Sequence, residues 1–407
     1  MAALSHIRIL DLSRILAGPW ASQTLADLGA TVTKIEQPGH GDDTRGWGPP
    51  YVHDRDGKPT RDSAYYLAAN RNKQSVAVDF TTAEGQAIVR DLALTADVVI
   101  ENFKCGGLAK YGLDYASLKA VKPDLVYCSI TGFGQTGPYA PRAGYDLLLQ
   151  AMGGLMSITG GADGAADAGP QRVGVAVVDL LTGMYAAVGI LAALTHRDRT
   201  GEGQHLDIAL LDVNVACLAN QALNYLVSGV APRRMGLAHP NVVPYQDFPT
   251  SDGAMIVAVG NDGQFARFAR ALGLAAMADD PKYATNAARV VNRAQLIAAL
   301  AAATATQSTA HWVAALEAAT VPCGPINDIA QVFADEQVVA RQLALDLPHP
   351  LAGTVPTVAS PLRLSASPVE YRSAPPPLGA DTRAVLTRDL GLDTAALDAL
   401  MARGVIA

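Results

Sequence analysis

Short apolar runs alternate with helix-like segments along the first third of the chain. The apolar runs are typical of buried strands and cover residues 7–13, 31–38, 75–80, 97–103 and 125–134. Between them, apolar positions recur at helical spacing in residues 18–30, 82–96 and 115–123. Buried strands that alternate with helices of this length form a parallel sheet covered on both faces. The pattern therefore predicts an α/β fold built on a doubly wound, Rossmann-like sheet.

The character of the chain changes after this region. Residues 138–170 are rich in Gly and Ala, which predicts a turn-rich loop without an intact helix. Residues 180–199 predict a buried helix with basic residues in its last turn. Short strands and helices between residues 233 and 321 predict a smaller α+β domain. The Pro-rich remainder, residues 345–407, ends in a helical pair that is expected to pack on the first lobe.

These changes predict two domains, because 407 residues exceed what one hydrophobic core usually serves. We expect residues 1–200 and 345–407 to form the large domain and residues 225–325 to form the small one. Residues 201–224 and 326–344 are then expected to be linkers.

Composition and charge disfavour several classes of function. The net charge is −7, the pI is about 5.6 and no basic face is evident, so nucleic acid is not expected as a partner. The four cysteines lack a CxxC pattern, which predicts reduced thiols in a cytoplasmic protein and no metal site. Charges interrupt the N-terminal segment where a signal peptide needs an apolar core. The apolar run of residues 180–195 is short for a membrane span, so no membrane partner is expected.

The usual mark of a dinucleotide site is missing. The turn after the first predicted strand is SRILAGPW, which lacks the GxGxxG pattern. A doubly wound sheet still binds ligands beyond the carboxyl ends of its strands. The loops there, at residues 14–18, 37–45, 102–110 and 131–137, hold glycines, amides and cations that suit a phosphorylated ligand. Ordinary surface loops are polar as well, so composition alone leaves both interpretations open.

Asp179 is the only carboxylate between Val173 and Thr195, in an otherwise apolar or uncharged segment. An ionised Asp is costly to bury unless it gains partners. One explanation is structural, since Asp is common as an N-cap that accepts hydrogen bonds from the first turn of a helix. The other is a chemical role for a carboxylate in apolar surroundings. Taken by itself, the segment is compatible with either.

Eight blocks of sequence occur in the order seen in one enzyme family. They are LDLSRILAGP, LADLGATVTKIEQPGHGDDTR, NRNKQSVAVD, DVVIENF, SITGFGQTGP, GYDLLLQAMGGLMSITG, DLLTGMYAAVGILAAL and VPCGPIND. Together they resemble the class III CoA-transferases, which include formyl-CoA and carnitine CoA-transferases and the related α-methylacyl-CoA racemases. The resemblance extends over nearly the whole chain. It implies an obligate homodimer in which two open, ring-like chains pass through each other, with a large domain made from both ends of each chain.

In this resemblance Asp179 takes the position of the family's catalytic aspartate. A carboxylate that attacks an acyl-CoA thioester forms a mixed anhydride and then an enzyme thioester, so CoA passes between two acids. Apolar surroundings exclude the water that would hydrolyse either intermediate. The resemblance therefore implies a CoA-transferase whose partners are an acyl-CoA and a carboxylic acid. Coenzyme A enters as the acyl-CoA substrate, and no tightly bound cofactor is expected.

The family's CoA contacts carry over to three groups of residues. Near the thioester, the matching positions are Ile15, Leu16 and Ala17. Near the adenosine and phosphates, they are Asn70, Asn72 and Lys73. At the ENF loop and the basic residue after it, they are Asn102, Phe103, Leu108 and Lys110. Gln37 stands where many members have Arg, and Arg45 or Lys73 is expected to compensate for it.

Two other functions stay open as alternatives. Racemases of this family use a His in a GHD triplet as an acid or base, and this chain has Gly144, Tyr145 and Asp146 there. Because the pKa of a free tyrosine is about 10, the triplet disfavours a racemase. A protein that only senses or scaffolds CoA esters would keep the sheet loops without a need for Asp179.

The blocks also bear on the acyl group. Formyl-CoA transferase has Gln at the position of Leu16 and a run of glycines where this chain has GNDGQF, so a formyl or oxalyl substrate is not expected. HPNVVPYQDF and VGNDGQF are more similar to the branch that acts on succinyl-CoA and other dicarboxylic acids. A second substrate carboxylate needs a cation, and the sequence leaves four candidates: Arg142, Arg172, Arg233 and Arg234.

Overall fold

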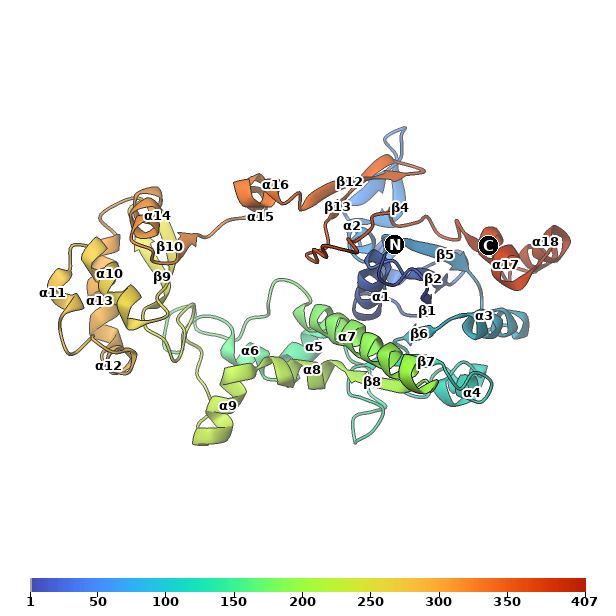
Figure 1. Ribbon diagram of the computed structural model, residues 1–407, viewed down its shortest axis with the longest axis horizontal. Helices are drawn as coiled ribbons and strands as arrows, with labels where there is room; N and C mark the ends of the chain where they lie inside the picture. The colour runs from blue at the N-terminus through green and yellow to red at the C-terminus, as the bar shows by residue number, and fades with distance from the viewer. Residues whose placement is uncertain (1) are drawn as a thin grey trace. The chain divides into compact units, whose positions relative to one another are not determined.

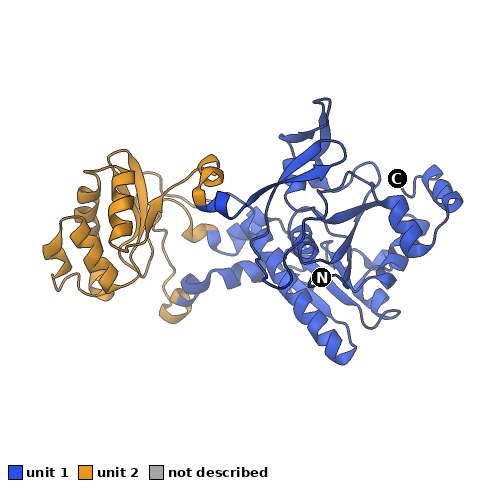
Figure 2. Cartoon of the chain, turned by 45° about the horizontal axis from the view of Figure 1, so that its top comes forward, with its two compact units in different colours: residues 1–155, 173–223, 337–407 blue, residues 156–172, 224–336 orange. Residues whose placement is uncertain are grey.

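The computed structural model describes residues 2–407 and divides into two compact units (Figure 2). Unit 1 contains Met1–Leu155, Val173–Leu223 and Gln337–Ala407, and unit 2 contains Met156–Arg172 and Asn224–Glu336. The C-terminal segment therefore lies in the same unit as the N-terminal one. Most of the stretch expected to be a first linker, residues 201–224, is also part of unit 1.

Unit 1 is built on a six-stranded parallel sheet, which confirms the predicted α/β class (Figure 1). In spatial order its strands are β5 (Lys73–Ala77), β2 (Thr31–Glu36), β1 (Arg8–Asp11), β6 (Val98–Glu101), β7 (Val126–Thr131) and β8 (His205–Ala209). The chain adds strands outward from β1 in one direction and then in the other, which is the order of a doubly wound sheet. β8 corrects the expected linker at residues 201–224. This edge strand is only partly buried, so its polar His205 and Asp207 hide the apolar pattern of a strand.

The strands are apolar on both sides because helices cover both faces of the sheet. One face packs on α1 (Ala17–Asp27) and α7 (Val177–Thr200). The other face packs on α3 (Ala83–Thr95), α4 (Tyr115–Lys119), α17 (Thr382–Leu390) and α18 (Thr394–Ala402). Successive strand residues point to opposite faces, so Ile9 joins the first cluster and Leu10 the second.

The C-terminal segment completes unit 1. β12 (Ala344–His349) pairs with β13 (Gly353–Val358), and Ile406 forms a bridge with Val78 just after β5. The guanidinium of Arg372 donates to three carbonyls at the end of α1, at 2.8–3.0 Å. The tail is thereby joined to the first lobe, as expected for a segment too poor in apolar residues to form its own core.

Unit 1 also contains several short elements. They are η1 (Asp43–Gly46), β3 (Tyr51–His53), β4 (Pro59–Ser63), α2 (Ala64–Leu67), η2 (Ala109–Tyr111), α5 (Asp146–Met152) and α8 (Leu210–Cys217). Three more helices cross the unit boundaries along the chain: α6 (Leu155–Ile158), α9 (Ala219–Ser228) and α16 (Glu336–Ala340). α5 and α6 correct the expectation of a helix-free loop at residues 138–170, because DLLLQAM forms a helix before Gly153 and Gly154 end it.

Unit 2 has an α+β arrangement. Its antiparallel sheet has the order β11 (Cys323–Pro325), β10 (Gly253–Ala258) and β9 (Tyr245–Thr250). Its helices are α10 (Asp262–Ala271), α11 (Ala275–Ala278), α12 (Asn286–Val291), α13 (Arg293–Thr304), α14 (Thr309–Ala318) and α15 (Ile329–Ala334). Large buried side chains such as Phe248, Phe265 and Trp312 form its core.

α7 is longer than the sequence pattern predicts, since it begins at Val177 and ends at Thr200. By length and composition alone it could cross a membrane, with a mean hydropathy of 2.0 over its most apolar window. In the structure, its buried side chains pack on α1 and on the strands of the sheet. This packing accounts for the apolar character of that side of the helix.

Candidate active site

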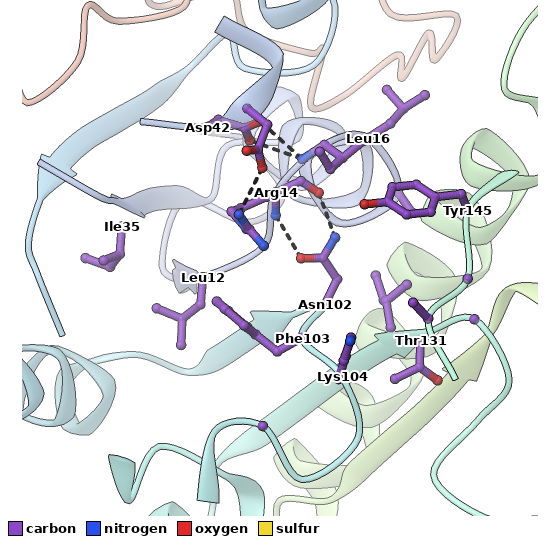
Figure 3. A pocket seen from close by; sticks show the side chains of 18 of the residues that line it. Leu12, Arg14, Leu16, Ile35, Asp42, Asn102, Phe103, Lys104, Thr131 and Tyr145 are labelled. Atoms are coloured by element: carbon purple, nitrogen blue, oxygen red, sulfur yellow. Dashed lines mark hydrogen bonds and ion pairs between the residues drawn. The ribbon is translucent and has the colours of Figure 1, made fainter. Parts of the chain in front are cut away.

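The strand order reverses between β1 and β6, and a pocket of about 550 Å³ opens at the carboxyl ends of these strands. Doubly wound sheets bind ligands at this place because the loops that leave the two strands diverge there. Figure 3 shows the turn after β1, with Arg14 and Leu16, opposite the loop after β6, with Phe103 and Lys104. Asp179 of α7 lines the same pocket, which lies within unit 1.

Asp179 reaches this pocket because α7 packs closely on α1. A Cβ atom on Gly183 would lie 2.6 Å from the carbonyl oxygen of Ala17 and 3.0 Å from the Cβ atom of Trp20. A side chain at this position would therefore force the helices apart. Residues four apart share a helix face, so Asp179 lies one turn before Gly183 on the side of α7 that faces the start of α1.

The structure corrects the idea that Asp179 is an N-cap. α7 begins at Val177, and the residue before it, Ala176, has no side chain that can cap the helix. The carboxylate of Asp146 does this from elsewhere in the chain. It accepts the N–H of Val178 at 2.8 Å and that of Asp179 at 3.4 Å. The carboxylate of Asp179 itself is not used to cap its helix.

The pKa of Asp179 is raised from its ordinary 3.8 to about 7. Burial is the larger cause, because desolvation disfavours the charged carboxylate, and the negative charge of Asp146 adds to it. A place in the first turn of a helix favours the charged form but does not outweigh these two effects. Asp179 therefore titrates near neutral pH, and shifts of this kind cluster at functional sites.

A close contact between two chain segments brings Asp146 to α7. A Cβ atom on Gly144 would lie 2.5 Å from the Cα atom of Gly132, just after β7. Glycine at both positions lets the two backbones touch. The chain then exposes Tyr145 at the pocket and buries Asp146 in the first turn of α5.

Six residues matched to the family's CoA contacts line the pocket. They are Ile15, Leu16, Ala17, Asn102, Phe103 and Lys110. The structure thus brings together the turn after β1 and the loop after β6. The Asn102 amide also has a partner in the protein, since its Oδ1 accepts the N–H of Arg14 at 2.9 Å and its Nδ2 donates to the Arg14 carbonyl at 2.6 Å.

The other four matched residues, Asn70, Asn72, Lys73 and Leu108, do not line the pocket. Lys73 is fully buried, and its ammonium lies 3.2 Å from a carboxylate oxygen of Asp11 and 3.0 Å from Oδ1 of Asn70. The Asn72 amide bonds the backbone of the C-terminal segment at 2.7 Å. Leu108 is part of the apolar core. In this structure all four have partners in the interior of unit 1.

The cations at the pocket are only in part those that the sequence singled out. Arg45, expected to compensate for Gln37, is buried and pairs with Glu36 at 2.7 Å and Asp62 at 2.5 Å. Lys104, which was not singled out, lines the pocket together with Gln37 and Lys110. Its position in the loop after a buried strand is the signal that could have identified it.

Of the four arginines considered for a second carboxylate, Arg142 lines the pocket. Its guanidinium lies 5.0 Å from the ring centre of Phe133 and 4.6 Å from that of Tyr139. Within residues 2–407 no carboxylate pairs with Arg142, so its charge is not neutralised by the described part of the chain. The other three, Arg172, Arg233 and Arg234, belong to unit 2, where Arg234 pairs with Asp163.

The described residues contain no group of three or more His, Cys, Asp or Glu side chains that could hold a metal ion. The four cysteines are free thiols. The reactive group that stands out in the pocket is the carboxylate of Asp179, and the N-terminus of α1 and several cations line the same pocket.

Known proteins are similar to this chain over most of its length. The family model described as CoA-transferase family III matches residues 4–382. A succinate–glutarate CoA-transferase of Agrobacterium fabrum is 53% identical over 383 residues, which cover 94% of each chain. A succinyl-CoA:glutarate CoA-transferase of Mus musculus is 44% identical over 406 residues, which cover 100% of this chain and 91% of the mouse protein.

A solved structure is similar as well. A CaiB/BaiF family protein from Brucella suis has a TM-score of 0.83 and 50% sequence identity, and the match covers 95% of this chain and 99% of that one. The family model, the sequence relatives and the solved structure agree with each other. The chain therefore belongs to CoA-transferase family III.

Proposed function

We propose that this CoA-transferase moves CoA from succinyl-CoA, or another dicarboxylyl-CoA, to a dicarboxylic acid such as glutarate, and that Asp179 is the covalent nucleophile. The observation that carries the proposal is the place of Asp179. Its half-buried carboxyl lines the same pocket as the turn after β1 and the cationic loop after β6. The names of the relatives, which transfer CoA between succinate and glutarate, support the choice of acids.

The reaction follows from a carboxylate held beside a thioester. A carboxylate oxygen of Asp179 attacks the acyl carbonyl, the C–S bond breaks, and CoA leaves as a thiolate with an acyl-aspartyl anhydride behind it. The thiolate then attacks the aspartyl carbonyl, which forms an aspartyl-CoA thioester and releases the donor acid. The carboxylate of the acceptor acid repeats the two steps in reverse order. No net oxidation and no hydrolysis occur, so the thioester energy is kept.

The surroundings of Asp179 suit this chemistry. A pKa of about 7 leaves a substantial ionised fraction at neutral pH, while burial keeps the carboxylate poorly solvated and reactive. Apolar side chains such as Ile130 and Leu210 line the same pocket and exclude water from the anhydride. The first turn of α1 places backbone N–H groups and a positive dipole end near the reacting carbonyl.

Arg142 is our candidate for the free carboxylate of a dicarboxylic substrate. It lines the pocket, the aromatic rings of Phe133 and Tyr139 hold its planar guanidinium, and the hydrogen bond that it donates goes to the weakly accepting sulfur of Met152, at 3.8 Å. An Arg fork binds a carboxylate through two parallel hydrogen bonds.

Arg142→Gln should raise the KM for glutarate more than that for butyrate, whereas Arg199→Gln, an exposed change at the far end of α7, should not discriminate between the two acids. Equal effects of Arg142→Gln on the two acids would contradict this assignment.

The transfer itself is tested with succinyl-CoA and glutarate, by following glutaryl-CoA chromatographically. Asp179→Asn keeps the size of the side chain and should lower the rate by more than about 10³-fold. Hydroxylamine added to the native protein with succinyl-CoA should leave a hydroxamate on Asp179 that mass spectrometry detects. Retained transfer in the variant would overturn the covalent role. Exchange of the α-proton of the acyl group in deuterated water, catalysed by the native protein, would instead favour the racemase alternative.

We also propose that the protein is an obligate, interlocked homodimer in the cytoplasm. Helices α5, α7 and α8 of unit 1 pack on each other and carry large exposed apolar residues: Leu147, Met184, Tyr185, Val188 and Val215. Val188, for example, is 61% exposed. Apolar surface of this extent is typical of an interface. The interlocked arrangement rests on the family resemblance, and the cytoplasmic location rests on the free thiols.

A further inference from the structure

The turn between β1 and α1 contains a backbone conformation that its residue disfavours. Ile15 has a φ of +72°, in the left-handed region. A β-branched side chain is strained there, and such conformations persist only where surrounding groups enforce them. Ile15 and its neighbours Leu16 and Ala17 line the pocket. The strain therefore lies at the place where the acyl-CoA is proposed to bind.

Side chains from two strands and one loop hold the backbone of this turn. The Ser13 N–H donates to Asp11 at 2.9 Å, and the Ser13 carbonyl accepts from the buried ammonium of Lys34 at 2.7 Å. Asn102 binds both the N–H and the carbonyl of Arg14, as Figure 3 shows. The turn is thus held by groups that come from β1, β2 and the loop after β6.

Asp42 acts on the strained residue itself. Both of its carboxylate oxygens accept the N–H of Ile15, at 3.2 and 3.3 Å. The carboxylate is buried, and it is fixed by an ion pair with Lys34 at 2.9 Å and by hydrogen bonds from the N–H and hydroxyl of Thr44 at 3.0 and 2.8 Å. Burial by itself would raise the pKa of Asp42, but Lys34 and Thr44 outweigh it and leave the pKa below its ordinary value. Asp42 therefore stays charged and in place at neutral pH.

The start of α1 depends on this turn for its orientation. Leu16 occupies the N-cap position and offers no side-chain hydrogen bond to the helix. A Cβ atom on Gly18 would lie 2.2 Å from Oγ of Ser13, so the turn and the first turn of the helix are in direct contact. If Ile15 relaxed to a negative φ, Leu16 and Ala17 would move relative to Asp179 across the pocket.

We propose that Asp42 is a positioning residue for CoA transfer: its carboxylate holds the N–H of Ile15 and so keeps the turn after β1 in the conformation that aligns a bound thioester with Asp179. Asn102 supports the same turn through Arg14. The inference rests on the proposed function, because it explains the strained turn as a device that places the thioester of a bound acyl-CoA. Loss of this support should affect the alignment of the reacting atoms more than the binding of free CoA.

The test uses a double-mutant cycle with the full-length protein. Glycine adopts a φ of +72° without strain, so Ile15→Gly removes the need for the Asp42 carboxylate. We expect Asp42→Asn to lower kcat by about 10²-fold, because a displacement of the reacting groups by about 1 Å has an effect of this size. The Kd for free CoA, measured by calorimetry, should stay within about threefold of the native value. In the Ile15→Gly background, the same substitution should have an effect at least about tenfold smaller.

Asp43→Asn is the matched control, since that exposed carboxylate binds the side chain of Arg14 at 2.9 Å and not the backbone of the turn. It should lower kcat less than Asp42→Asn.

The outcomes separate this inference from the proposed function. An inactive native protein would count against the proposed function, whereas an active native protein with an equally active Asp42→Asn variant would overturn the positioning role alone. A loss confined to CoA affinity, or a loss of kcat that is unchanged in the Ile15→Gly background, would also overturn it. If Asp42→Asn does not fold because Lys34 is left buried without its partner, the same cycle is run with Asn102→Ala, which removes no charge. A raised Kd for CoA with an unchanged kcat in that variant would make Asn102 a direct CoA contact and would contradict its support of the turn.

Discussion

The carboxylate of Asp146 accepts the backbone N–H of Asp179 at 3.4 Å, so one acid caps the helix that carries the other. The two residues are 33 positions apart in the sequence and meet because Gly144 contacts Gly132. Burial and then the charge of Asp146 raise the pKa of Asp179 to about 7. The same residue therefore helps to hold the helix of the proposed nucleophile and contributes to its raised pKa.

Asp146→Asn should move the pH dependence of transfer to lower pH. The Asp179 carboxylate must be ionised to attack, so kcat/KM for the acyl-CoA should rise with pH in the native protein and level off above about 7. Without the charge of Asp146, the midpoint should fall by about one unit. Asp212→Asn, at an exposed acid in the first turn of α8, is the control and should leave the midpoint in place. The same midpoint in Asp146→Asn would show that the two carboxyls are not coupled.

Asp179→Asn should make the protein more stable at neutral pH. The pKa of Asp179 in the folded protein is about 7, above the ordinary 3.8 of an unfolded chain, so the folded state binds this proton more tightly. This carboxyl favours folding at low pH, and the contribution is lost as the pH rises from about 4 to about 7. Relative to the native protein, the free energy of unfolding of the variant should therefore increase over this range by about 1–4 kcal/mol. Urea unfolding at both ends of the range measures it, and a difference that does not depend on pH would refute the raised pKa.

Gly183→Ala should lower both stability and transfer. The new Cβ atom would lie 2.6 Å from the Ala17 carbonyl oxygen, which belongs to the backbone of α1 and cannot move aside without moving the helix. We expect a loss of about 1–3 kcal/mol in the free energy of unfolding and a lower kcat, because α7 carries Asp179 away from the pocket. Gly189→Ala on the same helix is the matched control, since the atoms that its Cβ would meet belong to side chains, and the nearest is the end of the flexible Leu206 side chain at 2.7 Å. Equal effects of the two substitutions would mean that the contact with α1 does not position Asp179.

The proposed interlocked dimer should not dissociate on dilution. Separation of two chains that pass through each other requires unfolding, so the apparent mass should stay that of a dimer at every concentration at which the protein is folded. Light scattering at high concentration and mass photometry at nanomolar concentration cover the range. A folded monomer in equilibrium with dimer at micromolar concentration would rule out the interlocked arrangement.

The sequence by itself determined the class of the sheet and the segments that contain or overlap five of its six strands, all but β8. The apolar runs at residues 31–38 and 125–134 contain β2 and β7, and residues 82–96 contain α3, because buried strands and amphipathic helices leave local patterns. Asp179 could be singled out because a lone acid in an apolar helix is conspicuous within a few residues of sequence. The resemblance to a known family then indicated the activity, which the comparisons confirm.

Only the tertiary structure decided how the polar residues are used. Lysine side chains usually lie at the surface, yet the ammonium of Lys73 is buried against Asp11, 62 positions earlier. The cap on α7 comes from Asp146 and the support of Ile15 from Asp42, and no local pattern records either contact. Hydrophobic periodicity reports burial along one element, whereas hydrogen bonds and ion pairs depend on which distant segments the fold brings within about 3 Å of each other.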